Sequence, residues 1–419
     1  METLIIIIFI FGYLSITLEG SLQINKAATA LITGILCWTI FIIGAPFERE
    51  VIEKLGTHFN DIAGILFFLM GAMTIVELID MHNGFDFIRE KITTRKKVRL
   101  LWIISITTFF LSAVLDNLTT AIVMVSITRK LIPDKKDMSW FAVLIIIASN
   151  AGGAWSPIGD VTTTMLWIGG QITAVNIVHT LILPSIIALL LPVLLISPRL
   201  KGKYEENATT QHPKTSNSIY FFTGAGLLLM VPVFKILTHL PPYMGMLLAL
   251  SIMWIFTELR NKRQNHEEKY KPIVAQALQN IDTPSILFFA GVLLSVAALD
   301  ATGILHNTAV LLIEKLKNIH LIAMLIGLLS SVFDNVPLVA GTMGMFNLHS
   351  YPADNSLWEL LAYCTGTGGS ILIIGSAAGV AVMGMEKINF FWYLKNISFI
   401  ALLGYLAGVA CYLLQLKVF

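Results

Sequence analysis

The chain contains eight long runs of apolar residues, and these runs restrict the fold more than any other feature. They cover residues 3–18, 28–43, 62–79, 175–196, 219–237, 244–256, 284–299 and 390–416. A helix of about 20 apolar residues crosses the hydrocarbon core of a bilayer. Charged residues make up only 13% of the sequence, whereas soluble domains contain about 25%. The pattern predicts an all-α polytopic membrane protein embedded in a lipid bilayer.

Other sequence signals point away from secretion and catalysis. The first apolar run is expected to be a retained span, because no basic segment precedes it and no small-residue cleavage site follows it. The three cysteines lie in apolar stretches, where their spacing predicts neither a disulfide framework nor a metal site. No phosphate-binding loop, nucleophile elbow or metalloprotease motif occurs. We therefore predict no enzymatic activity, no cofactor and no nucleic-acid partner.

The basic residues predict the topology. Lysine and arginine gather in four clusters, at 89–99, 129–136, 199–214 and 260–271. Basic residues prefer the cytoplasmic side, and placing these clusters there together with Lys26 leaves both termini external. Segments 100–130 and 319–349 must then enter the membrane and return, as re-entrant helical hairpins from opposite sides. We expect a multi-pass location in the inner (cytoplasmic) membrane.

An internal repeat supports this threading. Three segments of the first half recur in the same order in the second half. The pairs are Ile65–Phe68 with Ile286–Phe289, Ser112–Asn117 with Ser330–Asn335, and Asn150–Ala154 with Gly366–Ser370. Each unit is predicted to contain a span, a surface helix, a re-entrant hairpin, a broken span and a final span. Because the hairpins enter from opposite sides, the two units are inverted, as in many secondary transporters.

The repeat divides the chain into six parts. They are N-terminal scaffold helices (1–60), the first repeat (61–197), a cytoplasmic linker (198–217), two scaffold helices (218–258), a second cytoplasmic linker (259–282) and the second repeat (283–419).

Polar residues stand at the expected tips of both hairpins. Asp116, Asn117 and Thr119 occupy the first tip, and Asp334 and Asn335 occupy the second. Such side chains are costly at membrane depth unless they bind something or line an aqueous cavity. Each aspartate could also cap the returning half-helix, and the two roles are compatible. We interpret these residues as part of a transport site.

The broken span of the first repeat supplies further candidates. Paired glycines and a proline within residues 150–164 should unwind the helix and free carbonyl oxygens, which suit a small cation. The candidate side chains here are Asn150, Asp160, Thr162 and Thr163. A role for Asp160 only as an N-cap is the structural alternative. The second repeat offers Ser370 and Ser376 but no acid in this segment, so the predicted site is asymmetric.

The charges of the predicted site select cations. Three aspartates without a nearby lysine or arginine should attract Na⁺ or Li⁺ and repel anionic substrates. A buried carboxylate that binds either a proton or a metal ion can exchange one for the other. We predict Asp116, Asn117, Asp160, Asp334 and Asn335 as Na⁺ and Li⁺ ligands. Glu77, deep in the third apolar run, is a second-rank candidate for a proton relay.

Three sequence blocks resemble the signature blocks of NhaD-type sodium/proton antiporters, within the wider ion-transporter superfamily. They are Leu111–Thr120, Ala151–Thr163 and Gly368–Gly379. The resemblance implies Na⁺/H⁺ exchange and a fold with a scaffold and a transport domain. It also implies transport roles for Asp116, Asn117, Asn150, Asp160, Thr162, Thr163, Asp334, Asn335 and Ser370. One departure is Gly64, where the family is expected to carry a glutamate.

Two other functions compete with this interpretation. A sodium-coupled carrier of a dicarboxylate or other anion could use the same fold, although Asp116 and Asp334 disfavour it. A passive cation channel is disfavoured by closed hairpins and the absence of a predicted pore-lining ring of helices. By analogy, the spans outside the repeats are expected to form a homodimer interface.

Overall fold

The computed structural model describes residues 1–17, 23–132, 134–204, 217–264 and 273–418. Regular structure in these ranges is helical, and β-type pairing there is limited to one isolated antiparallel bridge between Lys96 and Lys203. The predicted linkers 198–217 and 259–282 lie partly outside the described residues. The all-α prediction is confirmed for the described part of the chain.

The α-helices follow one another with few long connections. In chain order they are α1 (Glu2–Thr17), α3 (Lys26–Gly44), α4 (Glu48–Met81), α5 (Asp86–Lys91), α6 (Lys97–Ser112), α7 (Asn117–Leu131), α8 (Lys135–Gly153), α9 (Val161–Ile168), α10 (Ala174–Ile196), α11 (Ser218–Thr238), α12 (Pro242–Gln264), α13 (Ile273–Asn280), α14 (Thr283–Ala301), α15 (Ile304–Leu316), α16 (Ile319–Leu329), α17 (Asn335–Met345), α18 (Ser356–Gly368), α19 (Ala377–Glu386), α20 (Phe390–Tyr393) and α21 (Phe399–Val418). A 3₁₀ turn over Ser197–Arg199 ends α10, and a π-helical segment over Leu394–Ser398 joins α20 to α21.

Seven helical segments in the described residues are long and apolar enough to cross a bilayer. They are Lys26–Gly44, Glu48–Met81, Ala174–Arg199, Ser218–Thr238, Pro242–Lys262, Thr283–Ala301 and Phe390–Val418. Each coincides with one of the apolar runs in the sequence. Helix α1, which contains the remaining run, is also apolar but has only 16 residues. The chain is therefore an integral, multi-pass membrane protein.

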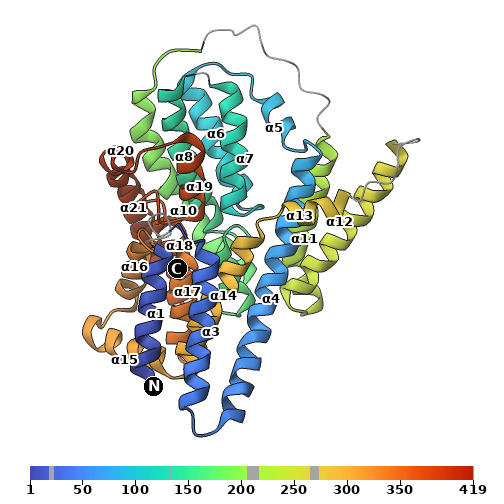
Figure 1. Cartoon of the computed structure of the whole chain (residues 1–419). Helices are drawn as coiled ribbons and strands as arrows, with labels where there is room; N and C mark the ends of the chain where they lie inside the picture. The colour runs from blue at the N-terminus through green and yellow to red at the C-terminus, as the bar shows by residue number, and fades with distance from the viewer. Residues whose placement is uncertain (18–22, 133, 205–216, 265–272, 419) are drawn as a thin grey trace.

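The same order of elements occurs twice along the chain. Helices α4 to α10 comprise a long helix, a short helix, a helix pair (α6–α7), two half-helices (α8 and α9) and a long helix. Helices α14 to α21 repeat this order, with α16–α17 as the pair and α18 and α19 as the half-helices. In Figure 1, α6 to α8 lie toward the top and α15 to α17 lie lower, while α11 and α12 stand beside α4 at the right.

The half-helices α8 and α18 lie at the centre of the molecule. Residues 144–154 and 357–370 are all buried. Two glycines allow the helix pairs to approach these half-helices closely. A side chain at Gly152 in α8 would meet the backbone of Phe109 in α6, and one at Gly368 in α18 would meet the backbone of Gly327 in α16. Because backbone atoms cannot move aside as a side chain can, both contacts require glycine.

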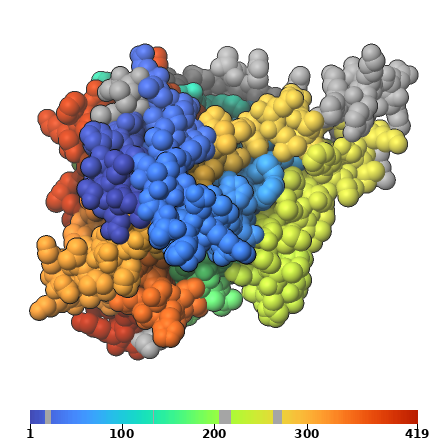
Figure 2. Space-filling view, turned by 60° about the horizontal axis from the view of Figure 1, so that its bottom comes forward, coloured from blue at the N-terminus to red at the C-terminus, as the bar shows by residue number. Residues whose placement is uncertain are grey.

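A second group of helices covers one side of this centre. Helix α3 packs along α14, where the Trp38 indole donates to the Leu294 carbonyl oxygen at 2.9 Å. Gly34 brings α3 against the backbone of Gly291. Figure 2 shows α1, α3 and α4 side by side on one face of the molecule. Helix α4 borders the cavity described below, and α3 begins beside it.

Candidate functional site

Four helices begin around one buried region, and each begins at a polar N-cap residue. The Asp116 carboxylate accepts from the Thr119 backbone N–H at 2.8 Å and caps α7. Asp160 accepts from the Thr162 N–H at 2.8 Å and caps α9. Asp334 accepts from the Val336 N–H at 3.1 Å and caps α17. The fourth cap is Ser376, which accepts from the Gly379 N–H at 3.1 Å at the start of α19.

These N-termini have a common electrostatic property. Unpaired N–H groups and the helix dipole make the start of a helix electropositive. A carboxylate at the cap satisfies those donors with a negative charge, whereas a serine hydroxyl does so without one. The predicted asymmetry between three acids and Ser376 is therefore present at the helix starts. All three aspartates are N-caps, as the structural alternative predicted. Capping does not prevent the same carboxylates from binding a cation.

A cavity of about 60 Å³ lies between these helix starts. A single water needs roughly 10–15 Å³ on this measure, so the space accommodates several waters or a cation. Its polar lining comprises Lys26, Asp116, Asn117, Asp160, Thr164, Ser285, Asp334 and Asn335. Phe68, Leu69, Val76 and Phe289 are among the apolar residues that close it toward α4 and α14. Both halves of the chain therefore contribute to one partly enclosed space.

Asp160 is the most thoroughly hydrogen-bonded acid of the cavity. Its side chain is buried, with 1% exposure of the residue. The Asn117 amide donates to Asp160 Oδ2 at 2.6 Å, and the Asn335 amide reaches Oδ1 at 3.5 Å. The Thr162 hydroxyl donates to Oδ1 at 2.7 Å. Asp160 thus accepts from Asn117, after the α6–α7 turn, and from Asn335, after the α16–α17 turn, so it connects the two halves of the chain.

Asn150 extends this network into the second half. It accepts from the Asn117 amide at 3.1 Å and donates to the hydroxyls of Ser370 and Ser376, each at 2.9 Å. The Tyr393 hydroxyl donates to the Ser370 carbonyl oxygen at 2.7 Å. Residues from the two distant halves of the chain therefore share one continuous set of hydrogen bonds.

The remaining predicted residues fall into two groups. Thr119 and Thr163 support the caps: the Thr119 hydroxyl donates to Asp116 Oδ2 at 2.5 Å, and the Thr163 hydroxyl donates to the Asp160 carbonyl oxygen at 2.9 Å. Glu77 lies outside the cavity lining, where it accepts from the Asn280 amide at 2.8 Å. Its proposed role as a proton relay stays a prediction.

Lys26 lines the cavity but was not among the predicted site residues. Its ammonium lies 4.0 Å from Asp334 Oδ2, so the expectation that no lysine or arginine stands near the acids is wrong. In the sequence, a lysine just before an apolar run is indistinguishable from an ordinary interfacial anchor. Only the packing of α3 against α14 brings Lys26 to the turn between α16 and α17.

The carboxylates do not form a dense metal cluster. Among the described residues, no three His, Cys, Asp or Glu side chains are grouped closely enough to hold a metal ion. A cation in this cavity would need amide, hydroxyl or backbone oxygens, or water, in addition to a carboxylate. Such donors are present in Asn117, Asn335 and Thr164.

Gly64, the departure from the resembling family, has a packing explanation in this chain. A Cβ atom at this position would lie 3.0 Å from the Tyr243 ring of α12. The residue therefore packs at the contact between α4 and α12, away from the cavity lining. A glutamate side chain here would have to displace the tyrosine ring.

A multi-pass helical protein with acids, amides and hydroxyls around a buried cavity belongs to the class of membrane transporters. The family model described as citrate transporter (CitMHS) matches residues 4–366. Sodium/proton antiporter 1 of Arabidopsis thaliana is 48% identical over 97% of this chain and 71% of its own length. Sodium/proton antiporter 2 of the same plant is 45% identical over 97% and 98%. The Na(+)/H(+) antiporter NhaD of Vibrio cholerae is 31% identical over 98% and 91%. The chain therefore belongs to the citrate transporter family, and within it to the family of NhaD-type sodium/proton antiporters.

Proposed function

We propose that this protein exchanges Na⁺, and also Li⁺, for H⁺ across the membrane, with Asp116, Asp160 and Asp334 as the acids of the exchange site. The observation that carries the proposal is the single cavity into which both halves of the chain direct these three carboxylates. The relatives named sodium/proton antiporters support the choice of ions.

The charge of the cavity favours cations. Three carboxylates and one ammonium, that of Lys26, line the cavity, so an ionised cavity has net negative charge. A carboxylate can bind a proton covalently or a metal ion electrostatically, and either ligand removes most of the affinity for the other. Na⁺ entry from one side then releases protons, and protonation from the other side releases Na⁺.

The helix starts provide an argument against the anion carrier. Helix N-termini bind carboxylate and phosphate groups well, and an anion carrier would present them free to its substrate. Here the starts of α7, α9 and α17 are already occupied by Asp116, Asp160 and Asp334. A citrate or dicarboxylate would meet these negative charges first. The family description nevertheless names citrate, so the sodium-coupled anion carrier is the alternative to be tested.

The arrangement in the membrane forms part of the proposal. We propose that α6–α7 and α16–α17 are re-entrant hairpins that enter from opposite sides, and that the two units are inverted repeats. The paired glycine contacts support the repeat, because Gly152 and Gly368 meet corresponding helix pairs. Ser112 and Ser330 likewise meet Gly159 and Gly375, the corresponding glycines after each break. We place the protein in the inner membrane with both termini external and the helices outside the repeats at a homodimer interface.

Proton flux in everted membrane vesicles, followed with a pH-sensitive dye, tests the function. Sodium or lithium, but not succinate, should dissipate the pH gradient, and Asp116→Asn and Asp334→Asn should abolish the response. Sodium-dependent uptake of citrate or succinate, with no response to sodium alone, would instead establish the anion carrier. Membrane insertion of each variant is checked by its yield in the vesicles.

A further inference from the structure

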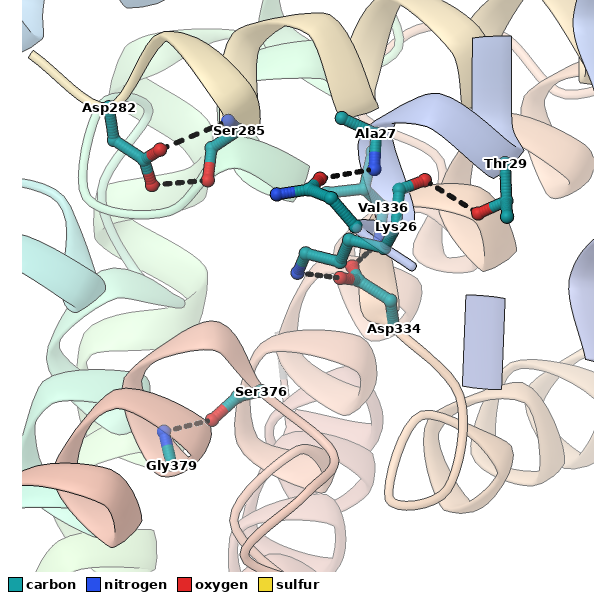
Figure 3. A network of polar contacts seen from close by, with 10 residues as sticks. Lys26, Ala27, Thr29, Asp282, Ser285, Asp334, Val336, Ser376 and Gly379 are labelled. Carbon is teal, nitrogen blue, oxygen red and sulfur yellow. Dashed lines mark hydrogen bonds and ion pairs between the residues drawn. The ribbon is translucent and has the colours of Figure 1, made fainter. Parts of the chain in front are cut away.

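Lys26 places an ammonium group beside a carboxylate of the proposed cation site. Its Nζ atom lies 4.0 Å from Asp334 Oδ2 and 4.5 Å from the centre of the Phe288 ring. The side chains of Lys26 and Asp334 are 31% and 21% exposed, so the ion pair is partly shielded from solvent but still accessible to ions. Figure 3 shows the lysine reaching from the start of α3 to the Asp334 carboxylate.

The two partners belong to different parts of the protein. Lys26 is the first residue of α3, whose start is fixed because Asn25 accepts from the Ala27 N–H at 2.8 Å. Asp334 lies in the turn between α16 and α17 in the second repeat. The ion pair therefore connects a helix outside the repeats with the turn that holds the acid.

The geometry leaves one oxygen of Asp334 available to a cation. Oδ1 accepts the Val336 N–H, which fixes the carboxylate at the start of α17. Oδ2 faces the Lys26 ammonium at a distance longer than an ordinary hydrogen bond. An ammonium and a sodium ion are both monovalent cations that bind carboxylate oxygen. They cannot both occupy this side of the carboxylate without mutual repulsion.

We propose that Lys26 is a tethered competitor for the transported cation at Asp334. The ammonium balances Asp334 when no Na⁺ is bound, and Na⁺ loading displaces it. Displacement also releases the contact between α3 and the α16–α17 turn, so cation loading changes the link between these two parts. The inference rests on the proposed Na⁺/H⁺ exchange. It implies that Lys26, a residue outside the repeats, lowers the affinity of that site for Na⁺.

The expected effect follows from the separation of the charges. For unit charges 4 Å apart, the interaction corresponds to roughly fivefold in bulk water and roughly a thousandfold near a protein surface. Partial exposure brings the value toward the lower limit. Removal of the Lys26 charge should therefore lower the apparent KM for Na⁺ by about tenfold.

Lys26→Gln removes the charge and keeps a polar side chain that is one atom shorter. Lys54→Gln is the matched control, because Lys54 also lies over a phenylalanine ring, that of Phe41 at 5.7 Å, but does not line the cavity. In everted vesicles, K26Q should lower the apparent KM for Na⁺, whereas K54Q should leave it unchanged. Lys26→Arg conserves the charge and should retain the wild-type KM. An unchanged or higher KM in an active K26Q protein would overturn the inference.

A second measurement needs no variant. In the purified wild-type protein, an amine-reactive acylating reagent followed by mass spectrometry reports how accessible Lys26 and Lys54 are. NaCl should increase labelling of Lys26 relative to Lys54, and choline chloride at equal ionic strength should not. Equal labelling in both salts would overturn the inference even if K26Q failed to fold.

The two proposals fail in distinguishable ways. If wild-type vesicles show no sodium-dependent proton flux, the proposed function fails and the inference fails with it. If wild-type exchange is present while KM and labelling are insensitive to Lys26, only the inference fails.

Discussion

Asp160→Asn should break the hydrogen bond between residue 160 and Asn117 in the polar network of the cavity. The wild-type carboxylate accepts on both oxygens, with the Thr162 groups on Oδ1 and the Asn117 amide on Oδ2. An asparagine retains one acceptor, which should stay with Thr162 and keep α9 capped. Its NH₂ group then faces the NH₂ group of Asn117. Two donors therefore oppose each other at a position where, in the wild type, a donor and an acceptor lie 2.6 Å apart.

The size of this effect follows from the hydrogen bond that the substitution removes. A hydrogen bond to a charged group contributes about 1.5–3 kcal/mol, and a buried donor left without an acceptor costs about 1–3 kcal/mol. Removing a buried negative charge offsets part of this loss. We expect Asp160→Asn to lower the free energy of unfolding by about 3 kcal/mol and to abolish sodium-dependent proton flux.

A double-mutant cycle identifies the cause. Asn117→Ala in the Asp160→Asn background removes the opposing donor, so the two changes should be non-additive by about 1–3 kcal/mol. The assay is unfolding of the purified protein by SDS titration, with helical circular dichroism as the signal. Additive losses, or an Asp160→Asn protein as stable as the wild type, would refute the reasoning from these hydrogen bonds.

Three further changes test other features. Gly152→Ala should cost about 1–3 kcal/mol in SDS titration because its Cβ meets the α6 backbone; Gly226→Ala, in open space on α11, should be neutral or stabilise by about 0.5–1 kcal/mol. Asp116→Ala removes the cap of α7 at Thr119 and should cost about 1–2 kcal/mol, whereas Asp116→Asn should retain stability and lose only transport. Burial and a hydrogen bond to a carboxylate raise the pKa of Tyr204, so the contribution of Tyr204 to native stability should be constant below about pH 10 and be lost progressively above it. Tyr204→Phe should make the alkaline loss of stability smaller in thermal unfolding measured at increasing pH, and an identical pH dependence in both proteins would contradict the assignment.

The sequence was informative where local chemistry decides the outcome. Glycines, a proline and capping residues determine where helices break, so the positions of Asp116, Asp160 and Asp334 at helix starts could be anticipated from motifs alone. The repeated order of elements followed from the same signals. The convergence of these three aspartates on one cavity is a consequence of packing. The internal repeat indicated only which residues of the two halves correspond to each other.

The positions that differed from expectation depend on contacts between distant segments. Lys26 reaches Asp334, near the other end of the chain, because α3 packs on α14, and neither apolar periodicity nor charge clusters contain that information. Gly64 shows the same limit: its partner, Tyr243, belongs to a helix outside the first repeat.

Helix α4 has 34 residues and contacts α3, α11, α12 and α14. At 1.5 Å per residue it is about 51 Å long, well beyond the roughly 30 Å thickness of a hydrocarbon core. Its first turns carry Glu48, Arg49, Glu50, Glu53 and Lys54 and must protrude from the lipid or tilt along its surface. Because α4 also borders the cavity, bilayer thickness acts directly on the tilt of a cavity wall. Reconstitution into lipids of graded acyl-chain length should therefore alter exchange even when the ionic conditions are held constant.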